Sequence, residues 1–329
     1  MIEKHILYGE ETYNLAPFKY EWAYTMSQHS LANHWTPNEV SMGREKLCYE
    51  QELSADERFM FKHVFATLTT ADLAIQENLT QRVYGLVKAA EIKLYIARQI
   101  AEEGLHSASY QHVIEVLGLD QEETYSLYKR VPAVSEWFAF AKSMTEAEDI
   151  LMPLIFYYAI FEGVFFPTAF AAIYSLQRRR LMVGTGEQIQ YIHRDETMHV
   201  GFGIRLIKEI IKEIGEKPAE TEVHRLFVQA LNKIEAWARH CIPDVLGYSA
   251  HLHIQHSKYL ADKRLKQLGY SPVFFVEEAL PWLDEQASIK KEKNFFETRV
   301  TDYQSGGALK FDDSPTGFDD LVDWRLRPI

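Results

Sequence analysis

Hydrophobic and polar positions follow the 3.6-residue period of amphipathic helices through most of the chain. Helical segments are predicted at about 54–84, 89–117, 121–130, 134–144, 150–176, 184–214 and 220–242, with further helical pieces across 245–290. The capping sequences that begin at Thr36 and Ser54 mark two helix starts, and Gly118 and Gly215 mark two helix ends. Asn-Gly and Asp-Gly hairpin turns do not occur in the sequence, so an all-α helical bundle is expected.

The two ends of the chain have a different texture from the helical part. Residues 1–35 predict an irregular N-terminal arm, broken by Pro17. From about 291 the chain is polar and glycine-rich, which is typical of a flexible C-terminal tail. We therefore expect a single domain over residues 1–290 and a tail over 291–329. The apolar residues of the tail, among them Phe318 and Trp324, are spaced like anchors for a partner, although a frayed end without a role has the same texture.

One segment, Ile150 to Leu176, is almost entirely apolar and carries a single acid, Glu162, near its middle. As a helix it would be about 40 Å long, enough to cross a bilayer, and the three arginines that follow resemble a positive flank. The alternative is a central helix that other helices surround. In that case Glu162 needs a partner, because a buried carboxylate costs several kcal/mol unless it is paired or bound to a metal.

Composition narrows the class of protein. The formal net charge of −12, from 47 acidic and 35 basic residues, argues against a general binder of nucleic acid and favours an acidic cytosolic enzyme. The only cysteines are Cys48 and Cys241, too few for a disulfide framework or a thiolate metal site. No secretion signal is recognisable at the N-terminus, so a cytoplasmic location is expected.

Two Glu-x-x-His motifs stand on predicted long helices, at Glu103 to His106 and at Glu196 to His199. Residues three apart share one helix face, so the carboxylate and imidazole of each motif can bind the same ion. A lone acid precedes each motif on the previous long helix: Asp72 lies 31 residues before Glu103, and Glu162 lies 34 before Glu196.

Helical bundles that hold two carboxylate-bridged metals use this set, with one acid from each of two helices and a Glu-x-x-His from each of two others. Four carboxylates and two neutral imidazoles would neutralise two divalent ions, and mixed nitrogen and oxygen ligands suit iron or manganese. Taken singly, each acid is more often solvated or ion-paired than a ligand. The six together predict a dinuclear metal centre.

Tyr110 lies four residues after His106 and would project from the same helix face. Such a tyrosine is usually a core residue, but beside a metal pair that activates dioxygen it would be an oxidisable phenol. Phe166, Phe170 and Ile192 flank the predicted ligands Glu162 and Glu196 at helical spacing. These three could shield a phenoxyl radical from water, or could be ordinary core.

The motifs resemble those of the small, radical-generating subunit of class I ribonucleotide reductase, a ferritin-like family of dinuclear metal carboxylate proteins. The resemblance covers roughly residues 30–303. It rests on Trp35, on LTTADLAIQ around Asp72, EEGLHSASY ending at Tyr110, FEGVFFPTAF around Glu162 and HRDETMH with Asp195, in the order and spacing of the family.

The resemblance implies that Asp72, Glu103 and His106 bind one metal and that Glu162, Glu196 and His199 bind the other, with Glu103 and a carboxylate of the second set bridging. It also implies a stable radical on Tyr110. Trp35, linked through Asp195 to His106, would begin the radical-transfer route, and Tyr303 in VTDYQSGG would be a relay near the tail.

The cofactor implied is a pair of iron ions, with manganese–iron or two manganese ions as alternatives, together with the tyrosyl radical. The implied partners are dioxygen, a second copy in a homodimer, and the large catalytic subunit, on which the C-terminal tail docks. No glycine-rich phosphate loop is present, so nucleotide reduction is expected on the large subunit. No membrane or nucleic-acid partner is expected. A ferritin-like diiron oxidase or oxygenase is the nearest alternative, and a metal-free helical scaffold or a membrane-attached protein is the alternative from another class.

Overall fold

The computed structural model describes residues 4–9 and 14–288. Over these residues the regular structure is helical and contains no strand. The α-helices are α1 (Glu21–Ala32), α2 (Glu45–Leu47), α3 (Ala55–Asn78), α4 (Tyr84–Leu86), α5 (Ala90–Leu117), α6 (Gln121–Arg130), α7 (Pro132–Thr145), α8 (Leu151–Leu154), α9 (Phe166–Gln177), α10 (Val183–Ile214), α11 (Glu220–Cys241), α12 (Ala250–Gln267) and α13 (Leu283–Ala287). The 3-10 helix is η1 (Pro37–Glu39), and the π-helices are η2 (Cys48–Glu52), η3 (Leu79–Val83) and η4 (Ile155–Phe165).

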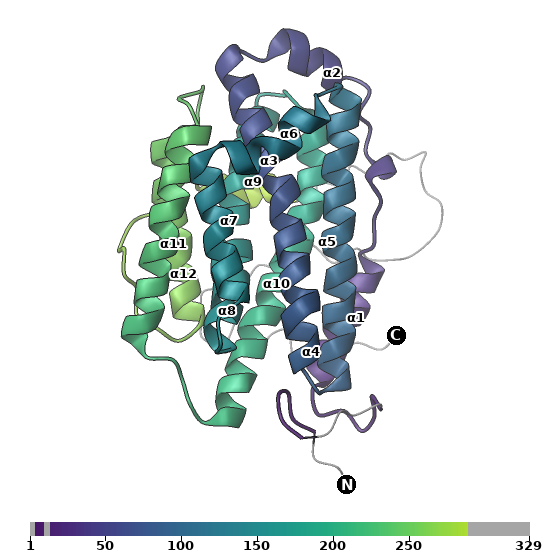
Figure 1. Ribbon diagram of the computed structural model, residues 1–329. Coiled ribbons are helices and arrows are strands. Elements are labelled where there is room, and N and C mark those ends of the chain that lie inside the picture. The colour runs from purple at the N-terminus through teal and green to yellow at the C-terminus, as the bar shows by residue number, and fades with distance from the viewer. Residues whose placement is uncertain (1–3, 10–13, 289–329) are drawn as a thin grey trace.

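The long helices lie side by side, so the expected all-α bundle is confirmed (Figure 1). Helix α1 packs on α5, and α5 packs on α3. Helices α11 and α12 lie at the opposite side of the bundle and pack on each other. The predicted tail, residues 291–329, and the relay Tyr303 lie outside the described residues.

The apolar segment forms one continuous run of α8, η4 and α9 through the middle of the bundle. Helices α10, α12 and α3 all pack against it. The span Leu151–Gln177 is long and apolar enough to cross a membrane, but the residues of its most apolar stretch are all buried inside the protein. The segment therefore fits the core helix of a helical bundle, and the membrane-anchor alternative does not account for it.

Gly163 and Pro167 would loosen a regular helix and remove one of its hydrogen bonds, so their positions in the sequence predict a distortion just after Glu162. The distortion is found, but it begins earlier than expected: η4 winds as a π-helix from Ile155 and includes Glu162 itself. Pro167 has no N–H to donate to the carbonyl of Gly163, four residues earlier. Arg264 of α12 supplies the missing donor, since its Nε lies 3.0 Å from the Gly163 oxygen. A Cβ at position 163 would lie 2.8 Å from that same nitrogen, so glycine is needed for this close approach.

The expectation of an irregular arm over residues 1–35 is wrong for its second half, because Glu21–Ala32 forms α1. The buried positions of α1 are the small residues Ala23, Ser27 and Ser30. A helix that packs through small residues approaches its neighbour closely but shows little hydrophobic periodicity, so the pattern of apolar residues did not indicate it.

The capping signals were accurate at all four positions, although one of them begins only a short helix. Ser54 caps α3 with a reciprocal capping box, and Gly118 and Gly215 end α5 and α10 in left-handed conformations, with φ of 67° and 74°. The capping box at Thr36 is also formed, but it starts only the single turn of η1. Local capping geometry fixes where a helix begins, whereas its length depends on the surface available for packing.

Candidate metal centre

Four helical elements bring the six predicted ligands into one buried region. Helix α3 supplies one acid, α5 and α10 each supply a Glu-x-x-His pair, and η4 supplies the acid of the apolar segment. All six side chains are at most 1% exposed: Asp72, Glu103, His106, Glu162, Glu196 and His199. Helical spacing accounts for the two pairs, and bundle packing brings the two lone acids to them.

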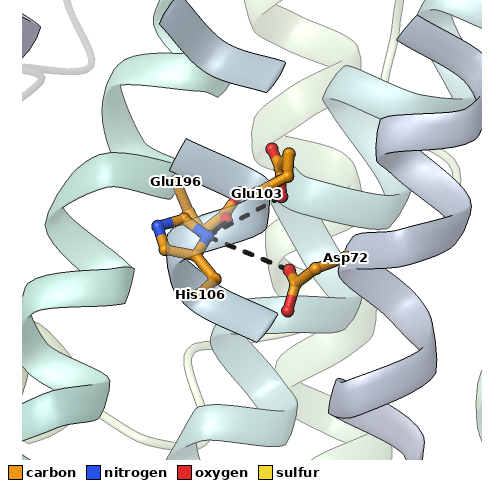
Figure 2. Close-up of side chains that lie close together, drawn as sticks. All are labelled: Asp72, Glu103, His106 and Glu196. Carbon is orange, nitrogen blue, oxygen red and sulfur yellow. Dashed lines mark ion pairs between the residues drawn. The ribbon is translucent and has the colours of Figure 1, made fainter. Parts of the chain in front are cut away.

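Around His106 the side chains form the first group. Its Nδ1 lies 3.0 Å from Glu196 Oε1, 3.7 Å from Glu103 Oε2 and 3.9 Å from Asp72 Oδ1. Figure 2 shows the three carboxylates on the Nδ1 side of the imidazole, with Asp72 on α3, Glu196 on α10 and Glu103 on the histidine's own helix, α5. One ligand atom from each of the four residues lies within 4.8 Å of the others, close enough to share one ion.

A second group of four surrounds His199. Its Nδ1 lies 3.2 Å from Glu103 Oε1 and 3.3 Å from Glu196 Oε2, and Glu162 completes the group. Glu103 and Glu196 therefore belong to both groups, each with one oxygen toward His106 and the other toward His199. This is the arrangement that two bridging carboxylates between two ions require.

The buried oxygens lack the hydrogen bonds that such groups ordinarily make. Within the described part of the chain, both oxygens of Asp72 and of Glu103 accept no hydrogen bond, and Glu162 Oε2 and Glu196 Oε1 also have none. The Nδ1 of His106 is likewise without a hydrogen bond. Cations would satisfy all of these atoms, so the residues present fit a pair of metal ions.

Electrostatics of the metal-free cluster are consistent with this interpretation. Burial, together with the negative charge of Glu103, raises the pKa of Asp72 well above its usual value. Burial and the charge of Glu196 do the same to the pKa of Glu162. Burial also acts to raise the pKa of Glu103, but its contacts with the two histidines outweigh this and lower it to about 2.

Both histidines hold protons strongly in the metal-free protein. Burial lowers the pKa of a histidine, but the surrounding carboxylates raise the pKa of His106 and of His199 well above the usual value. Protons on these imidazoles and on the two raised carboxyls balance the negative charge of the cluster. Divalent cations would displace those protons, so metal binding should release protons and weaken at low pH.

Glu162 is held in place by a chain of polar contacts that the sequence analysis did not identify. Gln99 donates from Nε2 to Glu162 Oε1 at 3.0 Å, and the Tyr158 hydroxyl donates to Gln99 Oε1 at 3.0 Å. Gln99 lies four residues before Glu103 and so shares its helix face. That spacing was the available signal, although glutamine on a helix is too common to be singled out by it.

Tyr110 is 1% exposed and lies beside the first group. Burial raises the pKa of its phenol well above the usual value, and the charge of Asp72 adds to the effect. The ring of Phe65 packs edge-on against it, with centroids 5.8 Å apart. Phe65 lies seven residues before Asp72 on α3, a spacing that places both on one helix face and could have marked it.

The three residues predicted to shield a radical are all fully buried. Phe166 and Phe170 stack on each other with ring centroids 5.6 Å apart, and Ile192 lies on α10 one turn before Glu196. Phe170 also packs on His193, at 5.4 Å between ring centroids. Their role around Tyr110 stays a prediction.

Trp35, Asp195 and His106 form a continuous hydrogen-bonded chain. The indole Nε1 of Trp35 donates to Asp195 Oδ2 at 2.8 Å, and the same oxygen lies 3.3 Å from His106 Nε2. Burial acts to raise the pKa of Asp195, but the contact with His106 and the charge of Arg194 lower it below its usual value. The carboxylate is therefore ionised and can accept from both neighbours.

A family model described as "Ribonucleotide reductase, small chain" matches residues 12–281. The chain is 35% identical over 318 residues to the ribonucleoside-diphosphate reductase subunit beta of Chlamydia pneumoniae, covering 90% of this chain and 91% of that protein. It is 29% identical over 310 residues to the human ribonucleoside-diphosphate reductase subunit M2, covering 91% and 76% respectively.

Two solved structures support the fold. The ribonucleotide reductase R2 subunit from Clostridium botulinum superposes with a TM-score of 0.81 at 24% identity, covering 86% of this chain and 94% of that one. The dimanganese(II)-NrdF from Streptococcus sanguinis superposes with a TM-score of 0.74 at 16% identity, covering 85% and 99%.

Proposed function

The chain belongs to the small-chain family of ribonucleotide reductases, and we propose that its buried cluster is the dinuclear metal centre that oxidises Tyr110. It is the small, radical-generating subunit of a ribonucleoside-diphosphate reductase, an oxidoreductase of deoxyribonucleotide synthesis. The observation that carries the proposal is the convergence of four carboxylates and two imidazoles, in which six carboxylate oxygens and Nδ1 of His106 have no hydrogen bond within the described residues.

The ligands divide between two ions. His106 and Asp72 would hold one ion, His199 and Glu162 the other, and the two carboxylates common to both groups would bridge them. Bound iron, or manganese in one or both positions, would supply from dioxygen the oxidising equivalent that the subunit needs. The polar chain from Tyr158 through Gln99 would hold Glu162 in place, and the apolar segment around it would exclude water.

Tyr110 would be the residue oxidised. It would lose one electron to the metal centre and its phenolic proton to a nearby base, leaving a neutral phenoxyl radical. The Phe65 ring, which packs edge-on against Tyr110, would protect the radical from water and reductants, and so would the burial of Tyr110 itself.

Trp35 would begin the transfer of the oxidising equivalent out of the subunit. An electron removed from its indole would be accompanied by a shift of the Nε1 proton toward Asp195, whose oxygen also contacts His106. Tyr303, beyond the described residues, would continue the route. The tail over residues 291–329 would dock on the large catalytic subunit, with residues 1–290 forming the metal-binding domain.

We infer that the protein works in the cytoplasm as a homodimer, together with a large subunit and dioxygen, and without a membrane or nucleic-acid partner. One relative in yeast has been solved as the ribonucleotide reductase Rnr4 homodimer, at 18% identity and a TM-score of 0.73. The complete burial of the apolar stretch supports the absence of a membrane partner.

The test is electron paramagnetic resonance after the metal-loaded, reduced protein is exposed to oxygen. A narrow phenoxyl signal is expected, and Tyr110→Phe should remove it. Tyr95→Phe is the matched control, since the Tyr95 phenol is also buried and its pKa also responds to cluster acids. This control should not remove the signal.

The result that would overturn the proposal is a signal that survives Tyr110→Phe and disappears in Tyr95→Phe. Binding of fewer than two metal ions per chain by the wild-type protein would remove the dinuclear centre itself. Activity provides a second readout, because deoxyribonucleotide formation with a cognate large subunit should be lost in Tyr110→Phe and retained in Tyr95→Phe.

A further inference from the structure

Each Glu-x-x-His motif is immediately preceded by another acid, Glu102 on α5 and Asp195 on α10. Each of these acids contacts the histidine of the other helix. Asp195, from the helix of His199, contacts Nε2 of His106 at 3.3 Å. Glu102, from the helix of His106, contacts Nε2 of His199 at 3.0 Å. The Nδ1 atoms of both histidines face the metal cluster, so both Nε2 atoms are directed at a carboxylate behind it.

The surroundings of Glu102 fix its position. It is 3% exposed, and its second oxygen, Oε1, accepts a hydrogen bond from the hydroxyl of Ser30 on α1. Arg98, one turn earlier on α5, lies with Nη2 3.1 Å from the same oxygen. Arg98 Nε also donates to the Ser30 hydroxyl at 2.8 Å. One oxygen is therefore occupied by these partners, and the other is left for His199.

The acid that contacts the other histidine, His106, is held in a similar way. Asp195 is held by an arginine of its own helix, Arg194, at 2.9 Å, and by Trp35. The two arginines also bind the end of α1, since Arg98 Nη2 donates to the Ser30 carbonyl at 3.4 Å and Arg194 Nη2 donates to the Asn33 carbonyl. The C-terminal end of α1 therefore connects the two carboxylates behind the cluster.

We propose that Glu102 is a positioning residue for His199, holding the imidazole with its proton on Nε2 and its Nδ1 lone pair toward the second metal ion. A neutral imidazole has one donor and one acceptor nitrogen, and a carboxylate on one nitrogen fixes which is which. Ser30 and Arg98 act through Glu102 by keeping its Oε2 on the imidazole. This inference rests on the proposed dinuclear function.

A structural role of the Glu102–Arg98 ion pair makes a different prediction. If the charge pair alone mattered, Glu102→Gln and Glu102→Ala would be equally harmful, because both remove the charge. If the hydrogen bond to His199 matters, Glu102→Gln should be less harmful than Glu102→Ala, because its amide oxygen can still accept from Nε2 while its amide nitrogen donates to the Ser30 hydroxyl. The comparison of these two variants therefore separates positioning from charge pairing.

The experiment is a titration of metal-free full-length protein with Mn²⁺, followed by electron paramagnetic resonance. In the wild type, two adjacent ions should couple and give little of the six-line signal of isolated Mn²⁺. In Glu102→Ala, affinity at the second ion should fall by about 10- to 100-fold, the usual effect of losing such a partner. Isolated Mn²⁺, about one per chain, should then persist while the first ion stays tightly bound.

Controls keep the result interpretable. Ser30→Ala should weaken the second ion less than Glu102→Ala, and Ser27→Ala, at a buried serine one turn earlier on α1, should bind both ions as the wild type does. If Glu102→Ala does not fold, Ser30→Ala and Glu102→Gln decide the question.

The proposal is overturned if Glu102→Ala binds two coupled ions with wild-type affinity, if it weakens both ions equally, or if Glu102→Gln is as impaired as Glu102→Ala. If Glu102→Ala does not fold, wild-type binding of both ions by Ser30→Ala or loss of the second ion in Glu102→Gln overturns it. Failure of the wild type to bind two ions would instead contradict the proposed function, so the two failures can be told apart.

Discussion

Replacing Glu162 by glutamine should change stability in opposite directions with and without metal. In the metal-free protein Glu162 is 1% exposed and its Oε2 accepts no hydrogen bond within the described residues. A glutamine keeps the oxygen that accepts from Gln99 and places an amide nitrogen toward the carboxylates of Glu103 and Glu196. A carboxyl that must hold a proton to stay buried beside other acids is thereby replaced by a neutral donor of the same shape.

The magnitude follows from two estimates. Relief of an unsatisfied buried group is worth about 1–3 kcal/mol, so Glu162→Gln should raise the free energy of unfolding of the metal-free protein by that amount. The pKa of Glu162 is raised in the folded state, so the protonated side chain favours folding at low pH and that contribution is lost as the pH rises. The gain should therefore be larger at pH 8 than at pH 5. With metal at 100 times its dissociation constant, each occupied site adds about 2.7 kcal/mol to the free energy of unfolding. The variant should lose the contribution of one site.

Urea unfolding of chelator-treated and Mn²⁺-loaded protein measures both effects. Glu77→Gln is the matched control, because Glu77 is exposed on α3 and its replacement should change stability by less than about 0.5 kcal/mol. The reasoning is refuted if Glu162→Gln destabilises the metal-free protein, or if Mn²⁺ stabilises the variant as much as the wild type.

Two further predictions concern packing and pH. A Cβ at Gly203 would lie 1.9 Å from Cγ of Tyr158, so Gly203→Ala should lower the free energy of unfolding by about 1–3 kcal/mol or more. Gly85 has open space around it, so Gly85→Ala should not have this effect. Equal urea midpoints for the two variants would contradict the prediction. Burial lowers the pKa of His256 to about 4, so the unfolded chain, which titrates near 6.5, binds more protons between these values and stability falls as the pH drops. This histidine should account for up to about 3 kcal/mol of the stability lost at low pH. His256→Gln in chelator-treated protein should remove that contribution, and an unchanged dependence of stability on pH in this variant would disprove the prediction.

The convergence of the six side chains could be predicted because helical spacing and bundle architecture constrain it strongly. A carboxylate and a histidine three residues apart must share a helix face, and an acid inside an apolar helix must have partners. Together with the arrangement known from bundles that hold two metals, these arguments grouped all six side chains, including Glu162. Periodicity and capping likewise indicated the long helices.

The parts that were missed depend on contacts between elements that leave no periodic signal. Helix α1 packs through Ala23, Ser27 and Ser30, and small residues do not stand out from a loop. Phe65 and Glu102 contact Tyr110 and His199, which lie on other helices. The start of η4 was misplaced because its wide turns extend well before Gly163, where nothing in the sequence marks them.

Anomalous X-ray diffraction from crystals of the metal-loaded protein, collected at the iron or manganese absorption edge, tests the central claim most directly. Two peaks per chain are predicted, one beside Nδ1 of His106 and one beside Nδ1 of His199, with Glu103 and Glu196 between them. A single peak, or peaks away from these residues, would contradict the dinuclear centre.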